Sequence, residues 1–229
     1  MPLHLHPDRF FPVDPTMRSI ARELFAGVEA LPIVSPHGHT DPQWFADNAP
    51  FEDATSLFLW PDHYLLRMLY SQGVSLEALG LSPQGGKAET DRRAIWRLFA
   101  RLYHLFRGTP SRLWLDHAFA TVFGLDVRLE EATADRYYDV IAEALATEAF
   151  RPRALFRRFN IEVLATTEGA LDPLAHHARL RQDWDGRVIT TFRPDDVTDA
   201  DKPEFSANIE ALGQMTGENT RNWDGYLKA

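Results

Sequence analysis

The segment LPIVSPHGHTDP, residues 31–42, decides the fold. Its first part, residues 31–35, is a short apolar run of the kind that forms a buried β-strand. His37 and His39 follow directly. Because side chains alternate along an extended chain, the imidazoles of these two histidines face the same side. The segment therefore predicts a strand whose carboxyl end presents a pair of histidines.

Two further strands are predicted far along the chain. Residues 161–167 (IEVLATT) and 187–192 (RVITTF) are short runs rich in β-branched residues. Between them, residues 172–184 predict a helix that opens with Asp172-Pro173, a capping residue followed by a proline suited to the first turn. Strands that alternate with helices indicate an α/β fold with a parallel sheet and right-handed crossovers.

Most of the remaining chain is predicted to be helical. Asp14-Pro15 begins a helix over 15–29 in the same way. Residues 41–158 repeat apolar residues at helical spacing, and loops rich in glycine and proline, such as 81–90, separate the helices. Two more helices are predicted over 203–215 and 218–229.

These predictions divide the chain into three segments. Residues 1–40 hold the N-terminal helix and the first strand, residues 41–158 form a large helical insertion, and residues 159–229 hold the other two strands with their helices. Functional groups of parallel α/β sheets lie at the carboxyl ends of the strands, so polar residues at these ends are the first candidates for a site. They are His37, His39, Thr166, Thr167, Glu168 and Arg193.

Composition excludes several classes of function. The formal net charge is −9 and the chain has no basic stripe that would neutralise phosphates, so we expect no nucleic-acid partner. No apolar run approaches the ~18 residues of a membrane span, so we expect no membrane partner. There is no cysteine, which excludes disulfides and thiolate chemistry. Together with an N-terminus that lacks a signal-peptide pattern, these features fit a cytoplasmic protein.

The His-x-His pair has two interpretations. Two imidazole nitrogens on one face can hold a divalent metal, most often zinc, with further ligands from elsewhere in the chain. They can also be two polar residues of a loop. The position at a strand end, among small residues, favours a metal site at His37 and His39. A second His-x-His pair, His4 and His6, follows no strand and is interpreted as a surface feature.

Other polar groups are candidates for contact with a substrate. His63 and Tyr64 open a predicted helix, where histidine can transfer protons and tyrosine can donate to a substrate oxygen. Alternatively, Tyr64 packs in the core and His63 caps the helix. Arg193 presents a planar guanidinium suited to a carboxylate, or it pairs with one of the two aspartates that follow it. Glu168 is open to three roles, namely metal ligand, base or cap.

Four segments are informative together, namely LPIVSPHGHTDP, LFLWPDHYLLRMLYSQGV, FNIEVLATTEGALDPLAHH and GRVITTFRPD. In combination they resemble the uronate isomerases (glucuronate isomerases) of the amidohydrolase superfamily. The matching segments follow one another in order along nearly the whole chain, from Pro15 to the end. It is their combination that is specific, because each motif alone is common.

The resemblance implies that the chain is the N-terminal part of a distorted (β/α)8 barrel of the TIM type. It implies an enzyme that interconverts D-glucuronate with D-fructuronate and D-galacturonate with D-tagaturonate. His37 and His39 are then expected to bind a divalent metal, zinc. His63 and Tyr64 are expected to be the catalytic pair that contacts the sugar acid, and Arg193 to bind the substrate. We also expect a homo-oligomer.

Three departures from the family pattern bear on function. Ser35 stands where many members carry an aspartate, and Thr-Thr-Glu-Gly at 166–169 stands where many carry Thr-Asp-Asp-Pro. Only three strands are predicted, so we expect a truncated form whose open strand edge associates with itself or with a partner. Two alternatives remain: a metal-dependent hydrolase of the same superfamily, or an inactive helical interaction fragment built from residues 41–158.

Overall fold

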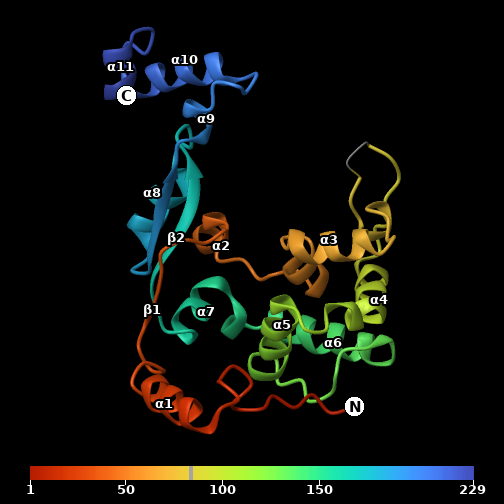
Figure 1. Ribbon diagram of the computed structural model, residues 1–229. Helices are drawn as coiled ribbons and strands as arrows, with labels where there is room; N and C mark the ends of the chain where they lie inside the picture. Colours follow the sequence, from red (N-terminus) through yellow and green to blue (C-terminus); the bar gives the residue numbers. More distant parts are fainter. Residues whose placement is uncertain (83–84) are drawn as a thin grey trace. The chain divides into compact units, whose positions relative to one another are not determined.

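The computed structural model describes residues 1–82 and 85–229, and its sheet confirms the three predicted strands (Figure 1). The first strand is shorter than the predicted run 31–35, and its register with the second strand shifts once. Both pairings are parallel, as predicted, so the fold is of the α/β class with a small sheet and many helices. In sheet order the strands are β1 (Ile33–Ser35), β2 (Ile161–Gly169) and β3 (Arg187–Arg193).

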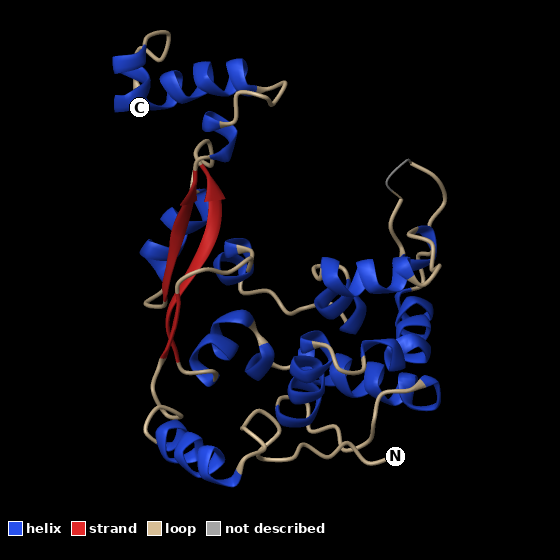
Figure 2. Ribbon diagram, viewed as in Figure 1, coloured by secondary structure: helices blue, strands red, loops and turns tan. Residues whose placement is uncertain are grey.

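Helices form most of the rest of the described chain, which confirms the helical predictions in outline (Figure 2). No helix within the described ranges is long and apolar enough to cross a membrane. The loop predicted over 81–90 includes residues 83 and 84, which lie outside the described residues. The α-helices are α1 (Pro15–Ala26), α2 (Pro42–Asp47), α3 (His63–Ser71), α4 (Arg92–Leu102), α5 (Pro110–Thr121), α6 (Ala134–Leu145), α7 (Pro152–Arg158), α8 (Ala175–Asp183), α9 (Asp195–Thr198), α10 (Phe205–Thr216) and α11 (Trp223–Lys228). Short turns of 3-10 or π helix lie at Thr55–Leu59, Glu77–Leu79, Tyr103–Phe106, Glu131–Thr133 and Glu148–Phe150.

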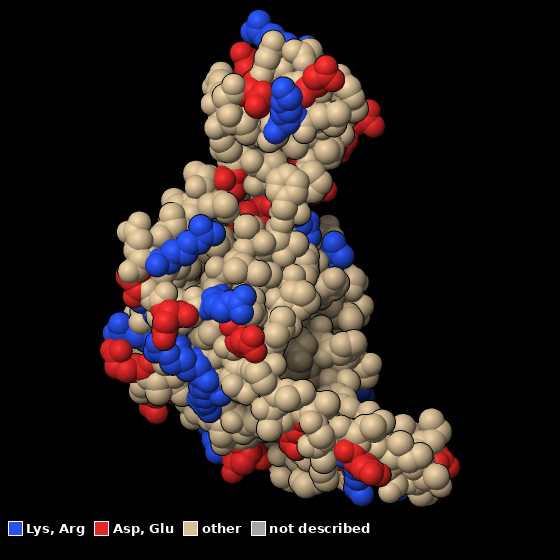
Figure 3. Space-filling model, turned by 90° about the vertical axis from the view of Figure 1, so that its left-hand side faces the viewer, with Lys and Arg blue, Asp and Glu red and all other residues tan. Residues whose placement is uncertain are grey.

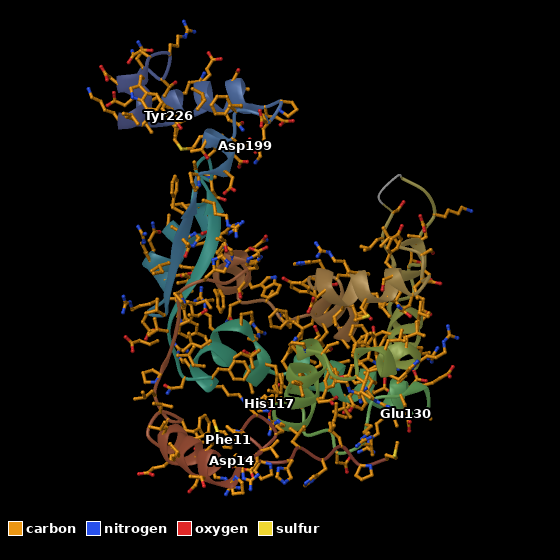
Figure 4. All side chains as sticks on the ribbon, viewed as in Figure 1. Phe11, Asp14, His117, Glu130, Asp199 and Tyr226 are labelled. Carbon is orange, nitrogen blue, oxygen red and sulfur yellow. The ribbon has the colours of Figure 1, made fainter. Side chains whose placement is uncertain are left out.

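Helix α1 begins where the sequence predicts. The carboxylate of Asp14 accepts the backbone N–H of Met17 at 2.8 Å, and Pro15 takes the first helical position (Figure 4). The ring of Phe11 packs edge to face on Phe25, with centroids 5.7 Å apart. This contact fixes the chain that enters the helix.

The predicted start of helix α8 is wrong. The helix begins at Ala175 rather than at Pro173, because Leu174 adopts a left-handed backbone with φ of 52°. The carboxylate of Asp172 accepts the N–H of Leu174 at 2.7 Å. Asp172 therefore closes a turn ahead of the helix, and residues 170–174 remain outside it.

The described chain divides into two compact units that interleave along the sequence. The first comprises Met1–Ala30 and Pro50–Arg151, and the second comprises Leu31–Ala49 and Pro152–Ala229. The helical core lies in the first unit and the sheet in the second. The limits of these units do not coincide with the segment borders expected after residues 40 and 158.

The core of the first unit is aromatic. Trp96, Phe119 and Tyr137 are fully buried, and the rings of Phe119 and Tyr137 meet edge to face with centroids 5.1 Å apart. The indole N–H of Trp96 donates to the carbonyl of Ala134 at 3.0 Å, and the hydroxyl of Tyr137 donates to the carbonyl of Val127 at 2.6 Å. The polar atoms of these rings are thus satisfied inside the core, where an unpartnered group would cost stability.

A buried carboxylate anchors this unit. Asp53 is 6% exposed, and its Oδ1 accepts the N–H groups of Thr55 at 2.8 Å and Ser56 at 3.0 Å. Arg92 donates to its Oδ2 at 2.8 Å. Burial raises the pKa of Asp53, but the hydrogen bonds from Arg92 and Ser56 outweigh it, so the pKa of this carboxyl lies below its usual value.

In the second unit, helices α2, α7 and α8 cover one face of the sheet. The rings of Phe45 and Trp184 stack with centroids 5.7 Å apart and planes 8° apart. Arg153 joins the three helices, since its Nε donates to the carbonyl of Phe45 at 2.8 Å and its guanidinium pairs with Asp183 at 3.2 Å. The buried apolar residues of this core are Phe45, Ala46, Phe156, Leu164, Leu180 and Val188.

The last helices of the second unit follow β3. The hydroxyl of Tyr226, in α11, donates to the carbonyl of Val197 at 2.9 Å, and the amide of Asn208 donates to the carbonyl of Asp196 at 3.0 Å. Figure 4 places Tyr226 and Asp199 in these neighbouring segments. These two bonds connect α9 with α10 and α11.

Replacing Asp53 by asparagine tests the buried anchor. Asparagine still accepts the N–H groups of Thr55 and Ser56 but loses the charge opposite Arg92, so D53N should lower the free energy of unfolding by about 2 kcal/mol at neutral pH. The pKa of Asp53 is lower in the folded chain than in the unfolded chain. Its contribution is therefore present above the unfolded pKa of about 4 and is lost as the pH falls through the folded pKa.

Urea unfolding at neutral pH and at about pH 2 measures both effects, and the difference between wild type and D53N should shrink in acid. D126N is the matched control, because Asp126 forms an exposed ion pair with Arg136 at 2.7 Å. Loss of this ion pair should lower the free energy of unfolding by less than about 1 kcal/mol. An effect of D53N that is no larger than that of D126N would contradict the anchor.

Candidate active site

A cleft of about 550 Å³ lies at the carboxyl ends of the strands in the second unit. The loop after β1, the end of β2, the turn before α8 and the end of β3 form its walls. Among the predicted site residues, it brings together His39, Thr167, Glu168 and Arg193. The residues that line the cleft are His39, Thr40, Asp41, Pro42, Gln43, Thr167, Glu168, Asp172, His176 and Arg193.

The histidine pair converges at the edge of this cleft. The Nε2 atoms of His37 and His39 are 3.0 Å apart, and the two rings meet edge to face with centroids 5.1 Å apart. Both side chains are exposed. The same-side orientation that alternation predicts is therefore confirmed, and the two Nε2 atoms lie within hydrogen-bond distance of each other.

Side chains of β2 and β3 hold the loop that carries the pair. The hydroxyl of Thr167 donates to the carbonyl of Gly38, and the hydroxyl of Thr191 donates to the carbonyl of Pro36 at 3.1 Å. A Cβ at Gly38 would lie 3.3 Å from the carbonyl oxygen of Ala165. A larger residue here would require this carbonyl to shift by a few tenths of an ångström, so the small residue between the histidines has a structural reason.

The pair fits two positions of a metal site. Neutral imidazole nitrogens are ligands for zinc, and two of them 3.0 Å apart can share one cation. Within residues 1–82 and 85–229, no group of three or more histidine, aspartate or glutamate side chains is placed to hold a metal. His37 and His39 are therefore the residues of this loop that could hold a metal, as two of its ligands.

Glu168 lies almost buried at the end of β2. Its side chain is 7% exposed, and its Oε1 lies 3.8 Å from Nε2 of the buried His177 in α8. Nε2 of His177 is closer to the hydroxyl of Thr166, at 2.9 Å, and this hydroxyl donates to the carbonyl of Ile189 at 3.1 Å. Because the hydroxyl proton of Thr166 is used in that bond, His177 is the donor to Thr166. The role of helix cap, left open for Glu168, is excluded because the residue is within a strand.

Arg193 ends β3 and lines the cleft with an exposed side chain. The alternative in which it pairs with a following aspartate is wrong. No ion pair of Arg193 occurs among the residues that the structure describes, and Lys202 binds Asp196 at 2.8 Å instead. The guanidinium of Arg193 therefore remains available for an anionic ligand.

His63 and Tyr64 lie at the start of α3 in the first unit. Asp62 caps this helix, since its carboxylate accepts the N–H groups of Tyr64 at 2.8 Å and Leu65 at 3.2 Å. Tyr64 is 63% exposed, and its ring lies 4.2 Å from the ring of His63. The alternative in which Tyr64 packs in the core and His63 caps the helix is therefore wrong. His63 and Tyr64 are not among the residues that line the cleft of the second unit.

The neighbouring residues His176 and His177 of α8 have no role that the sequence pattern predicts. Adjacent helical residues diverge by ~100°, so the side chains of these two histidines point in different directions. The structure gives them different surroundings, since His176 lines the cleft and His177 is buried against Thr166. The spacing of His177 to Leu180, one helical turn, is the signal that places His177 on the buried face of α8.

Charges around the sheet are mostly compensated. The face drawn in Figure 3 carries basic and acidic side chains next to each other. In the second unit, Arg179 of α8 binds Asp47 of α2 at 2.8 Å, and Arg157 binds Asp185 at 2.9 Å. Hydrogen bonds from Gln43 and then Arg179 lower the pKa of Asp47. Arg193, which lines the cleft, has no ion pair of this kind among the residues that the structure describes.

Comparison with known proteins identifies relatives over the whole chain. A family model described as glucuronate isomerase matches residues 14–229. The uronate isomerase of Rhizorhabdus wittichii is 63% identical over 229 residues, which cover all of this chain and 48% of that relative. The uronate isomerase of Phenylobacterium zucineum is 57% identical, again over all of this chain and 48% of the relative.

Solved structures agree with this result. The glucuronate isomerase of Caulobacter crescentus superposes with a TM-score of 0.94 at 56% identity, covering 100% of this chain and 48% of the other. The uronate isomerase of Thermotoga maritima superposes with a TM-score of 0.85 at 26% identity, covering 98% of this chain and 47% of the other. The chain therefore spans about half the length of the relatives it matches.

These matches confirm the resemblance that the sequence motifs predict. The match to the family model includes the sheet, the loop that carries His37 and His39, and Arg193. The same region includes the exposed His63 and Tyr64, so the predicted metal-binding and substrate-binding residues all fall within the matched region. The chain belongs to the glucuronate isomerase family.

Proposed function

We propose that this chain forms the histidine-bearing half of a uronate isomerase, an enzyme that interconverts an aldose and a ketose form of a hexuronate. One observation carries the proposal. In a chain of this family, the pair His37 and His39 and the unpaired Arg193 lie at the carboxyl ends of strands in one parallel sheet. Metal ligands and an anion-binding guanidinium at such strand ends suit a small sugar acid.

The proposal includes a distorted (β/α)8 barrel in the complete protein. Parallel sheets are normally buried on both faces. Here Ile33 and Val34 of β1 and Ile189 and Phe192 of β3 are exposed, Phe192 by 64%. Further parallel strands, from the half of the family's length that this chain does not span, would cover these side chains. The remaining half would then complete both the barrel and the site.

A divalent metal, zinc, is proposed to bind His37 and His39. When bound, it supplies Lewis-acid polarisation of the substrate carbonyl. Zinc takes four ligands in most protein sites, so the other positions belong to the remaining half, to water or to substrate. The 3.0 Å separation of the two Nε2 atoms supports this assignment.

The chemistry moves one carbon-bound proton and exchanges a carbonyl with a hydroxyl. For D-glucuronate, a proton leaves C2 and a proton is added at C1. The hydroxyl at C2 loses its proton, the oxygen at C1 gains one, and D-fructuronate results with no net change in composition. Arg193 binds the carboxylate with its planar fork. His63 transfers a proton, and Tyr64 donates a hydrogen bond to a substrate oxygen.

We also propose that the enzyme works in the cytoplasm as a homo-oligomer. The apolar side chains of Met17, Ile20 and Leu24 in α1 are all more than half exposed. Contiguous exposed apolar side chains are typical of surfaces that contact another polypeptide. The sedimentation velocity of the complete protein reports the number of subunits.

Ketose formation tests the proposed activity. The 229-residue chain is produced together with the remaining half of the Rhizorhabdus wittichii relative and supplied with D-glucuronate or D-galacturonate, with and without zinc. We expect ketose formation by the combined halves, none by either half alone, and none by the combination that carries H37A. Hydrolysis of esters or amides in its place would favour a metal-dependent hydrolase. A stable complex of the halves without either activity would favour the interaction fragment.

Zinc binding to the 229-residue chain tests the histidine pair. Each of H37N and H39N should weaken the binding of Zn²⁺ by about tenfold or more, because each removes one of two nitrogen ligands. Isothermal titration calorimetry measures the change. The double variant H4N/H6N is the matched control, since it removes the same residue pattern at an exposed site. An equal loss of affinity in this control would contradict a specific site.

Arg193→Met tests recognition of the carboxylate in the combined halves. The variant keeps the apolar stem but removes the guanidinium, so KM for D-glucuronate should rise by about 10- to 100-fold. R181M is the control, because Arg181 is exposed in α8 and does not line the cleft. An unchanged KM in R193M would show that the carboxylate is bound elsewhere.

A further inference from the structure

The carboxyl group of Glu168 has no hydrogen bond to any residue in the described ranges, although its side chain is only 7% exposed. Its Oε2 is buried and has no partner there. Nearly all buried polar groups in folded proteins are hydrogen-bonded, and a buried charge without a partner is costly. The environment of Glu168 is therefore incomplete, and the missing partner must be a hydrogen-bond donor or a cation.

The residues around Glu168 do not fill this role. Nε2 of His177 lies 3.8 Å from Oε1 of Glu168, beyond hydrogen-bond distance. Its proton is directed to Thr166, at 2.9 Å. The hydroxyl of Thr166 is committed to the carbonyl of Ile189. The polar groups beside Glu168 are thus satisfied with one another, and the carboxyl is left without a donor.

The carboxyl group of Glu168, which has no hydrogen-bond partner among the described residues, lines the same cleft as Arg193. Glu168 pairs in register with Phe192 of β3, the residue before Arg193, and both charged residues line the 550 Å³ cleft. They form no ion pair with each other in the structure, and Arg193 has none with any described residue. The cleft is therefore lined by a carboxyl group that has no hydrogen-bond donor and by a guanidinium that has no anionic partner within the described chain, and these two groups do not neutralise each other. A ligand that carries both hydroxyls and a carboxylate satisfies both groups.

We propose that Glu168 contacts the substrate and accepts a hydrogen bond from a hydroxyl of the hexuronate whose carboxylate binds Arg193. This inference rests on the proposed function and deepens it, because it assigns the part of the cleft that binds the hydroxyl groups of the substrate. The torsion that turns a carboxyl group is soft, so either oxygen of Glu168 can face the cleft.

Binding to the 229-residue chain tests the proposal, since every residue it uses belongs to one compact unit. Isothermal titration compares D-glucuronate, which has a carboxylate and hydroxyls, with butyrate, which has a carboxylate alone. E168Q keeps the size of the side chain but removes its charge. We expect E168Q to weaken D-glucuronate binding by about tenfold and to leave butyrate binding unchanged. R193M should weaken the binding of both ligands.

E162Q is the matched control, because Glu162 is an exposed glutamate at the other end of the same strand. It should bind both ligands as wild type does. Thermal unfolding supplies a readout that separates binding from structure. E168Q should leave the unfolding midpoint unchanged or raise it, because the carboxyl lost has no hydrogen bond to lose.

Three results would overturn the proposal. The first is an E168Q variant that binds D-glucuronate as wild type does. The second is an E168Q variant that loses both ligands equally and unfolds several degrees lower, which indicates a structural role. The third is a wild-type chain without saturable binding of D-glucuronate. The ketose assay of the combined halves is read independently, so loss of this subsite and loss of isomerase activity are distinguishable.

Discussion

The loop that carries the histidine pair depends on two threonine hydroxyls. Thr167 of β2 binds the carbonyl of Gly38, and Thr191 of β3 binds the carbonyl of Pro36. A strand of three residues, such as β1, makes few ladder bonds of its own, so these side chains complete the attachment of the loop to the sheet. The approach of His37 to His39 and the position of the cleft wall after His39 both follow from this attachment.

The side chains on the two faces of strand β2 contact different parts of the molecule. Leu164, Thr166 and Glu168 point to the helix-covered side, where the surroundings change from the apolar core to the hydroxyl–imidazole contact and then to the cleft. Thr167 points to the other side, and its hydroxyl donates to the carbonyl of Gly38. Alternation along one strand thus supports the core, the buried histidine and the histidine loop at the same time.

Much of the architecture could be predicted from sequence because its signals are local. Runs of β-branched residues gave the strands, helical spacing gave the helices, and the spacing of His37 and His39 gave their common side. The start of α8 was missed because Leu174 takes a left-handed backbone, which no periodicity predicts. The isolation of Glu168 was also beyond local reasoning. It depends on His177 binding Thr166 from a different element and on Arg193 lacking an ion pair, and both are properties of the packed structure.

The interleaved units have a consequence for the order of folding. β1 pairs with β2 across the whole segment that forms helices α2 to α7, so this pairing carries the entropy cost of closing a very long loop. Contacts within Pro50–Arg151 are nearer in sequence and can form first. Once that helical segment is compact, the flexible length between the two strands is much shorter. Synthesis from the N-terminus favours the same sequence of events, because β1 leaves the ribosome long before β2 and stays unpaired until the helices have collapsed.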